Sequence, residues 1–427
     1  MKFINKSYAL GTIFTCLISL SLFFKIESKQ YYDVSVVGNL NFADGLARLT
    51  IGLLDKFHDK LKMNFVPVNS YYTILQDLPS NIDHYLKNNN EVQNPGNISI
   101  LFEPIWYPNI GAYRKVPNSF IKIAYSMFET NQLPKQWPAI LNNNFDAVIV
   151  PDKYYEKIYK KCGVKIPIFT LPIGLYLEEW LSAQPKVVRN DIFTFGLSAT
   201  FWPHKNYNRL IEAFTKEFGN NNKVKLILHG RGGDQNICNE IKQLIKGYSN
   251  ISFIDNKLSN HEYKLLMQSF DCYVSLTKGE GYSVTPREAM SLGIPCILSR
   301  NTAHKTLCDT GFVRVVTAKI KEPAYYNFLK QYCGYNFNCT LDDASNALKD
   351  VYENYSFYLQ KAKLAREWVK RYLYDNLEPY YMALLKPTTV KRSHVNLLEP
   401  YTLSTNSKKL YKKYKQIINM HHNSRCE

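Results

Sequence analysis

The stretch from Cys272 to Ser299 constrains the fold most, because three elements follow one another in it with short connections. Its first part, Cys272–Thr277 (CYVSLT), is short, apolar and rich in β-forming residues, which predicts a buried strand. A helix is expected to begin at Thr285 and to end at Gly293, since glycine suits a helix end. A second apolar run then predicts another buried strand. Strand, glycine-containing loop, helix and strand together indicate half of a nucleotide-binding α/β unit.

The loop Lys278–Ser283 joins the first of these strands to the helix. It lies at the carboxyl end of the strand and leads into a helix N-terminus, where free N–H groups and the helix dipole favour a phosphate. Glu280 lies on the loop and Glu288 in the first turn of the helix, with seven residues between them. We therefore expect one carboxylate to accept hydrogen bonds from a sugar and the other from a ribose.

Three groups of residues at fixed spacing carry a family resemblance: Glu280-Gly281-Tyr282, Pro286-Arg287-Glu288-Ala289-Met290 and Gly293-Ile294-Pro295. Together they resemble the Glu-x7-Glu signature of family 4 glycosyltransferases, which are retaining enzymes of the GT-B fold that use nucleotide sugars. The resemblance implies that Glu280 hydrogen-bonds the donor sugar as a catalytic residue and that Glu288 holds the ribose. It also implies a substrate-binding role for three neighbouring residues, Gly281, Tyr282 and Ser283.

Two other interpretations of this stretch compete with the resemblance. Thr285-x-x-Glu288 is also a capping box, in which Glu288 would serve only the helix end. Gly279-x-Gly281 approaches a dinucleotide-binding fingerprint, but Val284 stands where the third glycine is required. The sequence therefore disfavours an NAD-dependent enzyme and leaves the capping interpretation of Glu288 open.

A second phosphate-binding position is expected after the predicted strand at residues 191–198 (DIFTFGLS). The loop that follows it resembles the family segment in which a glycine loop precedes a lysine, here Lys205. This catalytic lysine would offset the diphosphate charge, and an exposed lysine is the alternative. The family usually carries an arginine where this chain has Ser198, so we name Gly230 and Arg231 in a nearby loop as substrate-binding candidates.

The N-terminal part predicts a second Rossmann-like unit. Residues 33–38 (DVSVVG) indicate a strand, and apolar residues from Leu46 to Leu61 recur at helical spacing. The resemblance implies that Gly45 and Arg48, at the start of that helix, lie near the donor phosphates. A turn glycine and a solvated arginine are the alternative.

Five further strands are expected in this part: Met63–Val68, Ile98–Phe102, Phe120–Met127, Ala147–Val150 and Pro167–Leu171. Two of them end in carboxylates, Glu103 and Glu129. Because side chains just beyond parallel strands point into a crevice, we predict that these two bind the acceptor. A turn residue is the alternative for each.

The composition of the chain limits the classes of binding partner and cofactor that we expect. The chain has 427 residues and a net charge of +17, yet it shows no zinc-ligand spacing, RNA-binding motif or arginine cluster, so we expect no nucleic acid. A membrane surface or a phosphorylated substrate fits the charge better. The nine cysteines lack Cys-x-x-Cys spacing, which argues against a zinc site or a disulfide scaffold. No Asp-x-Asp occurs, so we expect neither a catalytic metal nor another cofactor.

We divide the chain into five segments: a hydrophobic anchor or signal at 1–30, an acceptor domain at 31–180, a nucleotide-sugar domain at 190–355, crossover helices at 356–386 and a basic tail at 387–427. Tyr8–Phe24 is uncharged and flanked by lysines, so we expect an uncleaved, single-pass membrane anchor, with the side of the catalytic domain undecided. The tail suits an anionic membrane surface or is solvated. Lys319–Thr340 reads as irregular and Tyr-rich, with no assigned role.

The resemblance implies an α/β chain of the GT-B class, with two Rossmann-like parallel-sheet domains facing across a cleft. The predicted function is transfer of a sugar from a nucleotide-sugar donor to a glycan, lipid-linked or protein acceptor, with retention of configuration. The alternative is a non-catalytic binding or scaffold protein on a degenerate GT-B fold. Glu280, Glu288 and Lys205 favour the enzyme, and the missing arginine at Ser198 favours the alternative.

Overall fold

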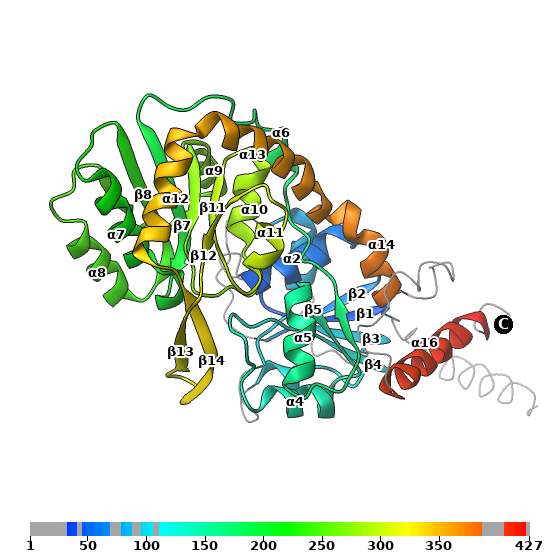
Figure 1. The fold of residues 1–427 in the computed structure, drawn as a ribbon. Coiled ribbons are helices and arrows are strands. Elements are labelled where there is room, and N and C mark those ends of the chain that lie inside the picture. The colour runs from blue at the N-terminus through cyan, green and yellow to red at the C-terminus, as the bar shows by residue number, and fades with distance from the viewer. Residues whose placement is uncertain are drawn as a thin grey trace, which may run out of the picture.

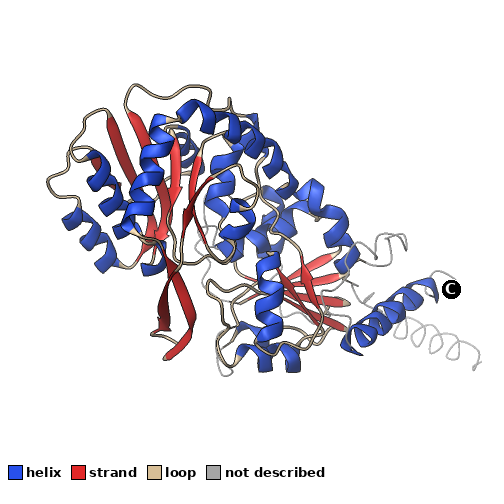
Figure 2. Cartoon of the chain, viewed as in Figure 1, coloured by secondary structure: helices blue, strands red, loops and turns tan. Residues whose placement is uncertain are grey.

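The computed structural model describes residues 32–40, 45–68, 78–87, 95–105, 111–386 and 405–423. Two six-stranded parallel sheets, each with its own helices, form two α/β domains, and Figures 1 and 2 show the C-terminal domain at the upper left and the N-terminal domain at the lower right. The predicted fold class is therefore confirmed. The strands of a parallel sheet are buried on both faces, which is why most of the strands here are runs of mostly apolar residues.

The N-terminal sheet has the order β2-β1-β3-β4-β5-β6. Its strands lie within the predicted ranges: β1 (Val34–Gly38), β2 (Met63–Pro67), β3 (Ile98–Leu101), β4 (Ile121–Tyr125), β5 (Ala147–Val150) and β6 (Ile168–Thr170). The connecting helices are α2 (Gly45–Lys56), η1 (Ser80–Ile82), α3 (Asp83–Lys87), η2 (Ala112–Lys115), α4 (Trp137–Asn144) and α5 (Lys153–Lys161). Strands β1, β3 and β5 are buried throughout, as their apolar sequences require.

The C-terminal sheet has the order β12-β11-β10-β7-β8-β9. Its strands are β7 (Phe193–Phe201), β8 (Val224–Gly233), β9 (Ile251–Ile254), β10 (Cys272–Ser275), β11 (Cys296–Arg300) and β12 (Arg314–Thr317). Its helices are η3 (Pro203–Lys205), α7 (Tyr207–Phe218), α8 (Gln235–Leu244), α9 (Asn260–Gln268), α10 (Val284–Ser291), α11 (His304–Cys308) and α12 (Leu341–Glu353). Strand β10 sits in the middle of this sheet, so its carboxyl end opens at the centre of the domain's edge.

The two domains are joined twice. The chain first crosses through α6 (Glu178–Ser182), and then returns through α13 (Tyr355–Val369), η4 (Lys370–Tyr372) and α14 (Tyr374–Leu385). The return is tightly packed, because a Cβ added to Gly52 of α2 would lie only 1.6 Å from the hydroxyl oxygen of Tyr374. Glycine at that position therefore lets the crossover helix approach the first domain closely. Helices α13 and α14 thus lead back to the N-terminal domain, and α14 ends against it (Figure 1).

Helix α16 (Thr405–Asn423) changes the interpretation of the tail. Leu410, Tyr414 and Ile417 are buried, and the Tyr414 hydroxyl donates to the Leu384 carbonyl at 3.0 Å. The ammonium group of Lys413 pairs with Asp146 at 2.8 Å. This apolar face packs on the protein, so the tail does not offer it to a membrane surface as predicted.

Two other predictions need correction. Residues Lys319–Thr340 are not irregular, because β13 (Ile320–Tyr326) and β14 (Gln331–Asn338) form an antiparallel hairpin. The predicted localisation through a single-pass membrane segment is not supported, since none of the helices in the described ranges is long and apolar enough to cross a membrane. The segment Tyr8–Phe24 that motivated it lies outside the described residues.

Candidate functional site

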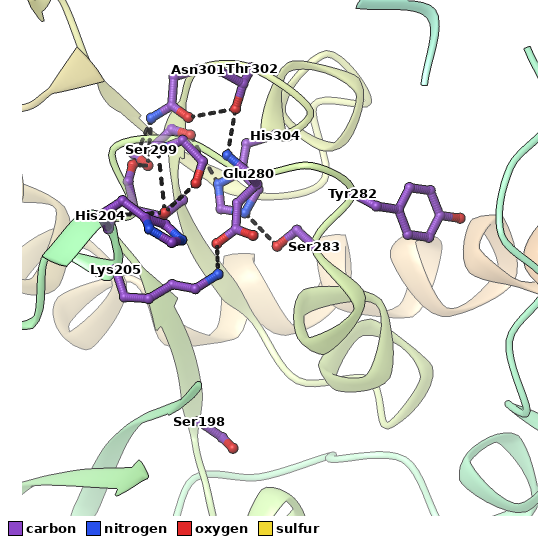
Figure 3. Close-up of polar contacts among 12 residues, drawn as sticks. Ser198, His204, Lys205, Glu280, Tyr282, Ser283, Ser299, Asn301, Thr302 and His304 are labelled. Atoms are coloured by element: carbon purple, nitrogen blue, oxygen red, sulfur yellow. Dashed lines mark hydrogen bonds and ion pairs between the residues drawn. The ribbon is translucent and has the colours of Figure 1, made fainter. Parts of the chain in front are cut away.

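Lys205 and Glu280 form an ion pair at the carboxyl edge of the C-terminal sheet. Lys205 ends η3 after β7, and Glu280 lies on the loop between β10 and α10. The Lys205 Nζ is 2.7 Å from Glu280 Oε1 (Figure 3). The two residues lie 75 positions apart in the sequence, so the fold unites the two predicted catalytic residues.

The Glu280 carboxyl group is held in its ionised form. Burial by itself would raise its pKa, but the charges of Lys205, His304 and His204 outweigh burial and lower the pKa to about 2. A carboxylate that stays charged at neutral pH is an acceptor of hydrogen bonds only. It therefore suits the hydroxyls of a sugar.

The backbone of the Glu280 loop is fixed from both domains. The Glu280 N–H donates to Thr302 Oγ1 at 2.7 Å, and the Tyr155 hydroxyl of α5 donates to the Glu280 carbonyl. Thr302 has a positive φ of 32°, which places its side chain beneath the loop and beside Asn301. Sequence reasoning misses Thr302, Asn301 and Tyr155, because none of them lies in a recognisable motif.

Ser283 and His304 close the other side of the loop. Ser283 has a φ of +70°, and its hydroxyl lies 2.7 Å from His304 Nε2. The second ring nitrogen of His304, Nδ1, is 3.1 Å from the Ser299 carbonyl, so Nδ1 carries the proton and Nε2 accepts from Ser283. Burial lowers the pKa of His304 to about 4, and the ring is therefore neutral near pH 7.

Tyr282 does not join the ion pair, although it was predicted to bind substrate. Its ring points away from Lys205 and Glu280 (Figure 3), and its hydroxyl donates to the Ile173 carbonyl at 3.1 Å. The buried guanidinium of Arg287 stacks 3.8 Å from the centre of this ring. The Tyr282 side chain thus packs the loop against the N-terminal domain.

Glu288 is placed by two partners, neither of which is a helix cap. Its Oε1 accepts from Arg48 Nη1 of α2 at 3.1 Å, and its Oε2 accepts from the Tyr263 hydroxyl of α9 at 2.6 Å. Helix α10 begins at Val284, and the preceding Ser283 makes no side-chain capping bond. The capping interpretation of Glu288 is therefore wrong, and its carboxylate faces the space between the domains.

Two adjoining hollows open between the domains and share Arg48 and Val284. The first, of about 610 Å³, contains Lys205 and Glu280 together with the loop residues Gly281 and Ser283. The second, of about 490 Å³, contains Glu288 and is lined by the aromatic residues Tyr176, Trp180 and Tyr263. One elongated ligand can therefore reach from the first carboxylate to the second.

The two predicted acceptor-side carboxylates behave differently. Glu129 lines the first hollow, and its Oε1 accepts from the Tyr326 hydroxyl of the hairpin at 2.9 Å. Burial raises the pKa of Glu129 more than this hydrogen bond and Lys205 lower it. Glu103 accepts from the Asn39 amide at the end of β3, outside the described residues that line the two hollows.

The remaining predicted residues lie at the edges of the site. Gly45 is the first residue of α2, and Gly230 lies in β8, where a Cβ would come within 3.0 Å of the Phe201 ring. Arg231 also belongs to β8, but its side chain is outside the described part of the chain. Ser198 makes a 2.8 Å hydrogen bond to His229 Nδ1. Within the described ranges, no group of three or more His, Cys, Asp or Glu residues is placed to hold a metal ion.

Comparisons with known proteins agree with this architecture. The structure superposes on Anabaena HepE in complex with UDP-glucose, with a TM-score of 0.61 and 11% identity over 83% of this chain and all of that chain. A glycosyltransferase from Rickettsia africae ESF-5 gives a TM-score of 0.58 and 13% identity over 83% of this chain and 97% of that chain. Two parallel α/β domains with the site between them are the GT-B fold.

The match to a family model falls on the part of the chain that carries Lys205 and Glu280. Residues 181–319 match the family described as glycosyl transferases group 1. A putative glycosyltransferase, EpsF of Bacillus subtilis (strain 168), is 30% identical over 166 residues, which is 38% of this chain. That match spans 40% of the length of the relative.

Proposed function

We propose that this chain is a nucleotide-sugar-dependent glycosyltransferase that moves a sugar from its donor to a glycan, lipid-linked or protein acceptor. The Lys205–Glu280 ion pair in the interdomain hollow carries the proposal, because it sets a cation 2.7 Å from a carboxylate that is charged at neutral pH. A donor has both groups that such a pair can bind, a diphosphate and sugar hydroxyls. The family match of residues 181–319 supports the same activity.

The donor lies along both hollows in this proposal. Its diphosphate lies beside Lys205 and the N-terminus of α10, where backbone N–H groups favour negative charge. Its sugar hydroxyls donate to Glu280, and its ribose hydroxyls donate to Glu288 in the second hollow. Arg48, which the two hollows share, must then give up part of its contact with Glu288 or extend it to a phosphate.

The transfer retains the anomeric configuration in this proposal. The bond between the anomeric carbon and the diphosphate oxygen breaks, and the acceptor oxygen attacks from the face that the diphosphate leaves. The proton of the acceptor hydroxyl passes to the departing diphosphate, so no side chain needs to act as a nucleophile. Lys205 stabilises the negative charge that develops on the diphosphate. We further propose that the reaction needs no metal ion or other cofactor, since the sequence has no Asp-x-Asp.

A non-catalytic binding protein on the same fold is the second candidate. It is favoured by Ser198, which stands where the family usually has an arginine and instead hydrogen-bonds His229. Such a protein would bind a nucleotide or glycan without turning it over. Binding and turnover must therefore be measured on the same preparation.

The test begins with a thermal-shift screen of nucleotide sugars, with UDP-glucose first because HepE is seen in complex with it. Any donor that raises the melting temperature is then incubated with the protein, and release of nucleoside diphosphate is followed. Proton NMR of the released or transferred sugar gives its anomeric configuration. Stabilisation with turnover and a retained configuration supports the enzyme, and stabilisation without any turnover supports the binding protein.

A further inference from the structure

The hairpin β13–β14 is attached to the two segments that carry Lys205 and Glu280. The Phe337 N–H donates to the carbonyl of Lys278 at 2.8 Å, two residues before Glu280. The Asn206 amide, next to Lys205, donates to Asn338 Oδ1 at 2.8 Å. The base of the hairpin is therefore part of the floor of the site, and the hairpin projects from the C-terminal domain alongside the other domain (Figure 1).

The far part of the hairpin is attached to the N-terminal domain. The Thr130 hydroxyl donates to the Cys333 carbonyl at 2.6 Å, and the Tyr335 N–H donates to Asn131 Oδ1 at 2.8 Å. Gly334 has a φ of +73°, and a Cβ there would lie 2.3 Å from the Asn131 side chain. Glycine is thus required for this close approach. These contacts hold the segment that follows β4 against the hairpin.

Glu129 lies between these two attachments. Its carboxylate accepts from the Tyr326 hydroxyl at 2.9 Å, and the Tyr326 ring stacks 5.0 Å from that of Phe128. On the other side, a Cβ on Gly279 would lie 2.1 Å from the Glu129 carbonyl, so the Glu280 loop touches the Glu129 backbone. The position of Glu129 is therefore fixed by the same elements that fix Glu280.

The wall of the first hollow that the N-terminal domain supplies is mostly apolar. Its described lining residues are Leu46, Arg48, Pro104, Met127, Phe128, Glu129, Trp137 and Ile173. Among them Glu129 carries the one carboxylate. Arg48 is paired with Glu288, so what this wall offers is an apolar surface with one carboxylate, which suits a neutral hydroxyl compound such as a sugar ring.

We propose that Tyr326 is a positioning residue that holds the Glu129 carboxylate as the hydrogen-bond acceptor for the attacking hydroxyl of a neutral acceptor. This inference rests on the proposed function and adds the side of the cleft that receives the acceptor. Glu129 orients the hydroxyl before transfer, and the proton of that hydroxyl still passes to the departing diphosphate as the new bond forms. Tyr326 acts only through Glu129. The hairpin therefore belongs to the site, although it carries no part of the family signature.

Several titratable groups face Glu129. They come from β13, β14, η3, the β10–α10 loop and α5: Tyr326, Cys333, Lys205, Glu280 and Tyr155. Burial raises the pKa of Glu129, and Glu280 adds to that rise, whereas Tyr326 and Lys205 lower the pKa. Replacing Tyr326 by phenylalanine removes a lowering contribution, so the pKa of Glu129 rises further.

The test uses hydrolysis of a nucleotide sugar, in which water takes the place of the acceptor. UDP-glucose, UDP-N-acetylglucosamine and GDP-mannose are supplied to the full chain from pH 4.5 to 8, and calorimetry gives the affinity for UDP and GDP. We expect Glu129→Gln to lower the hydrolysis rate by roughly 10- to 100-fold, the scale of losing one positioning group. Tyr326→Phe lowers it several-fold and moves its acid limb to higher pH by about half a unit to one unit. Affinity for the diphosphate stays within about twofold in both variants.

The matched control is Tyr325→Phe, which removes a hydroxyl from the outer face of the same hairpin, where the ring is 50% exposed. It should change neither rate nor pH profile. In the Glu129→Gln background, Tyr326→Phe should have no further effect. An unshifted acid limb in Tyr326→Phe, or a normal rate in Glu129→Gln, overturns the inference. If no nucleotide binds the unmodified chain, the proposed function itself fails. Calorimetry detects that failure independently of the rates and pH profiles that test the roles of Glu129 and Tyr326.

Discussion

Glu280 and Glu288 are only eight positions apart, yet their surroundings differ in kind. Glu280 pairs at 2.7 Å with Lys205 of its own domain. Glu288 pairs at 3.1 Å with Arg48, which belongs to the opposite domain. Both residues of the first pair belong to one domain, whereas the second pair joins the two domains and depends on how closely they approach each other.

This difference indicates how the two hollows respond to a donor. The loop around Glu280 is held by Thr302 and His304 of the same domain and by Tyr155 of the other domain. Lys205 and Glu280 themselves lie on one domain, so the sugar end of the donor meets a preformed pair. At the nucleoside end, Arg48 already occupies one oxygen of Glu288. Binding a ribose there has to compete with an interdomain contact.

The largest effect should come from breaking the preformed side. Glu280→Ala removes the acceptor for the donor sugar and should lower turnover by roughly 100-fold or more. Folding should be nearly intact, because the loop keeps its backbone bonds to Thr302 and Tyr155. Turnover and far-ultraviolet circular dichroism are the measurements. Near-normal transfer would remove Glu280 from the site.

The cation of the same pair should give the next largest effect. Lys205→Ala should weaken binding of a nucleoside diphosphate by about 1.5–3 kcal/mol, the range for a hydrogen bond to a charged group. Titration calorimetry with UDP and GDP measures this loss. Lys216→Ala on α7, which removes a half-exposed lysine paired with Asp342, is the control and should leave the affinity unchanged.

The interdomain pair should respond more weakly. Glu288→Gln keeps an oxygen for Tyr263 but removes the charge that faces Arg48, so the donor KM should rise roughly 10-fold. The melting temperature should change little, because Glu288 caps no helix. Glu262→Gln is the matched control, since Glu262 forms a true capping box with Ser259 on α9. An unchanged KM in Glu288→Gln would exclude a role in donor binding.

The last prediction concerns how the free energy of unfolding depends on pH, and it involves His304 beside the Glu280 loop. The pKa of His304 is lowered by burial to about 4, below its ordinary value of 6.5. The unfolded chain therefore takes up a proton near pH 6.5 while the folded chain stays neutral, and the free energy of unfolding falls as pH drops from 6.5 to 4. A single histidine such as His304 changes the free energy of unfolding by at most about 1.4 kcal/mol per pH unit. Urea unfolding at several pH values should show this slope, and His304→Gln should flatten it.

The sequence predicts well what is local. The strands of the first sheet, strands β7, β10 and β11 of the second, the Glu280 loop and Lys205 follow from apolar runs and from a motif with fixed spacing. The partners of these residues do not, because they come from distant parts of the chain: Arg48 and Glu288 are 240 positions apart. The hairpin is missed for a different reason, since its Gly334, Pro323 and scattered tyrosines hide the alternation by which a strand is recognised.

The central claim is that the two carboxylates bind opposite ends of one donor. Calorimetry of whichever of UDP and GDP binds, on the unmodified chain, Glu280→Ala and Glu288→Gln, tests this claim most directly. A nucleoside diphosphate has a ribose but no donor sugar, so we predict that Glu288→Gln weakens its binding roughly 10-fold while Glu280→Ala changes it less than about twofold. Equal losses in both variants, or a loss only in Glu280→Ala, would contradict the account.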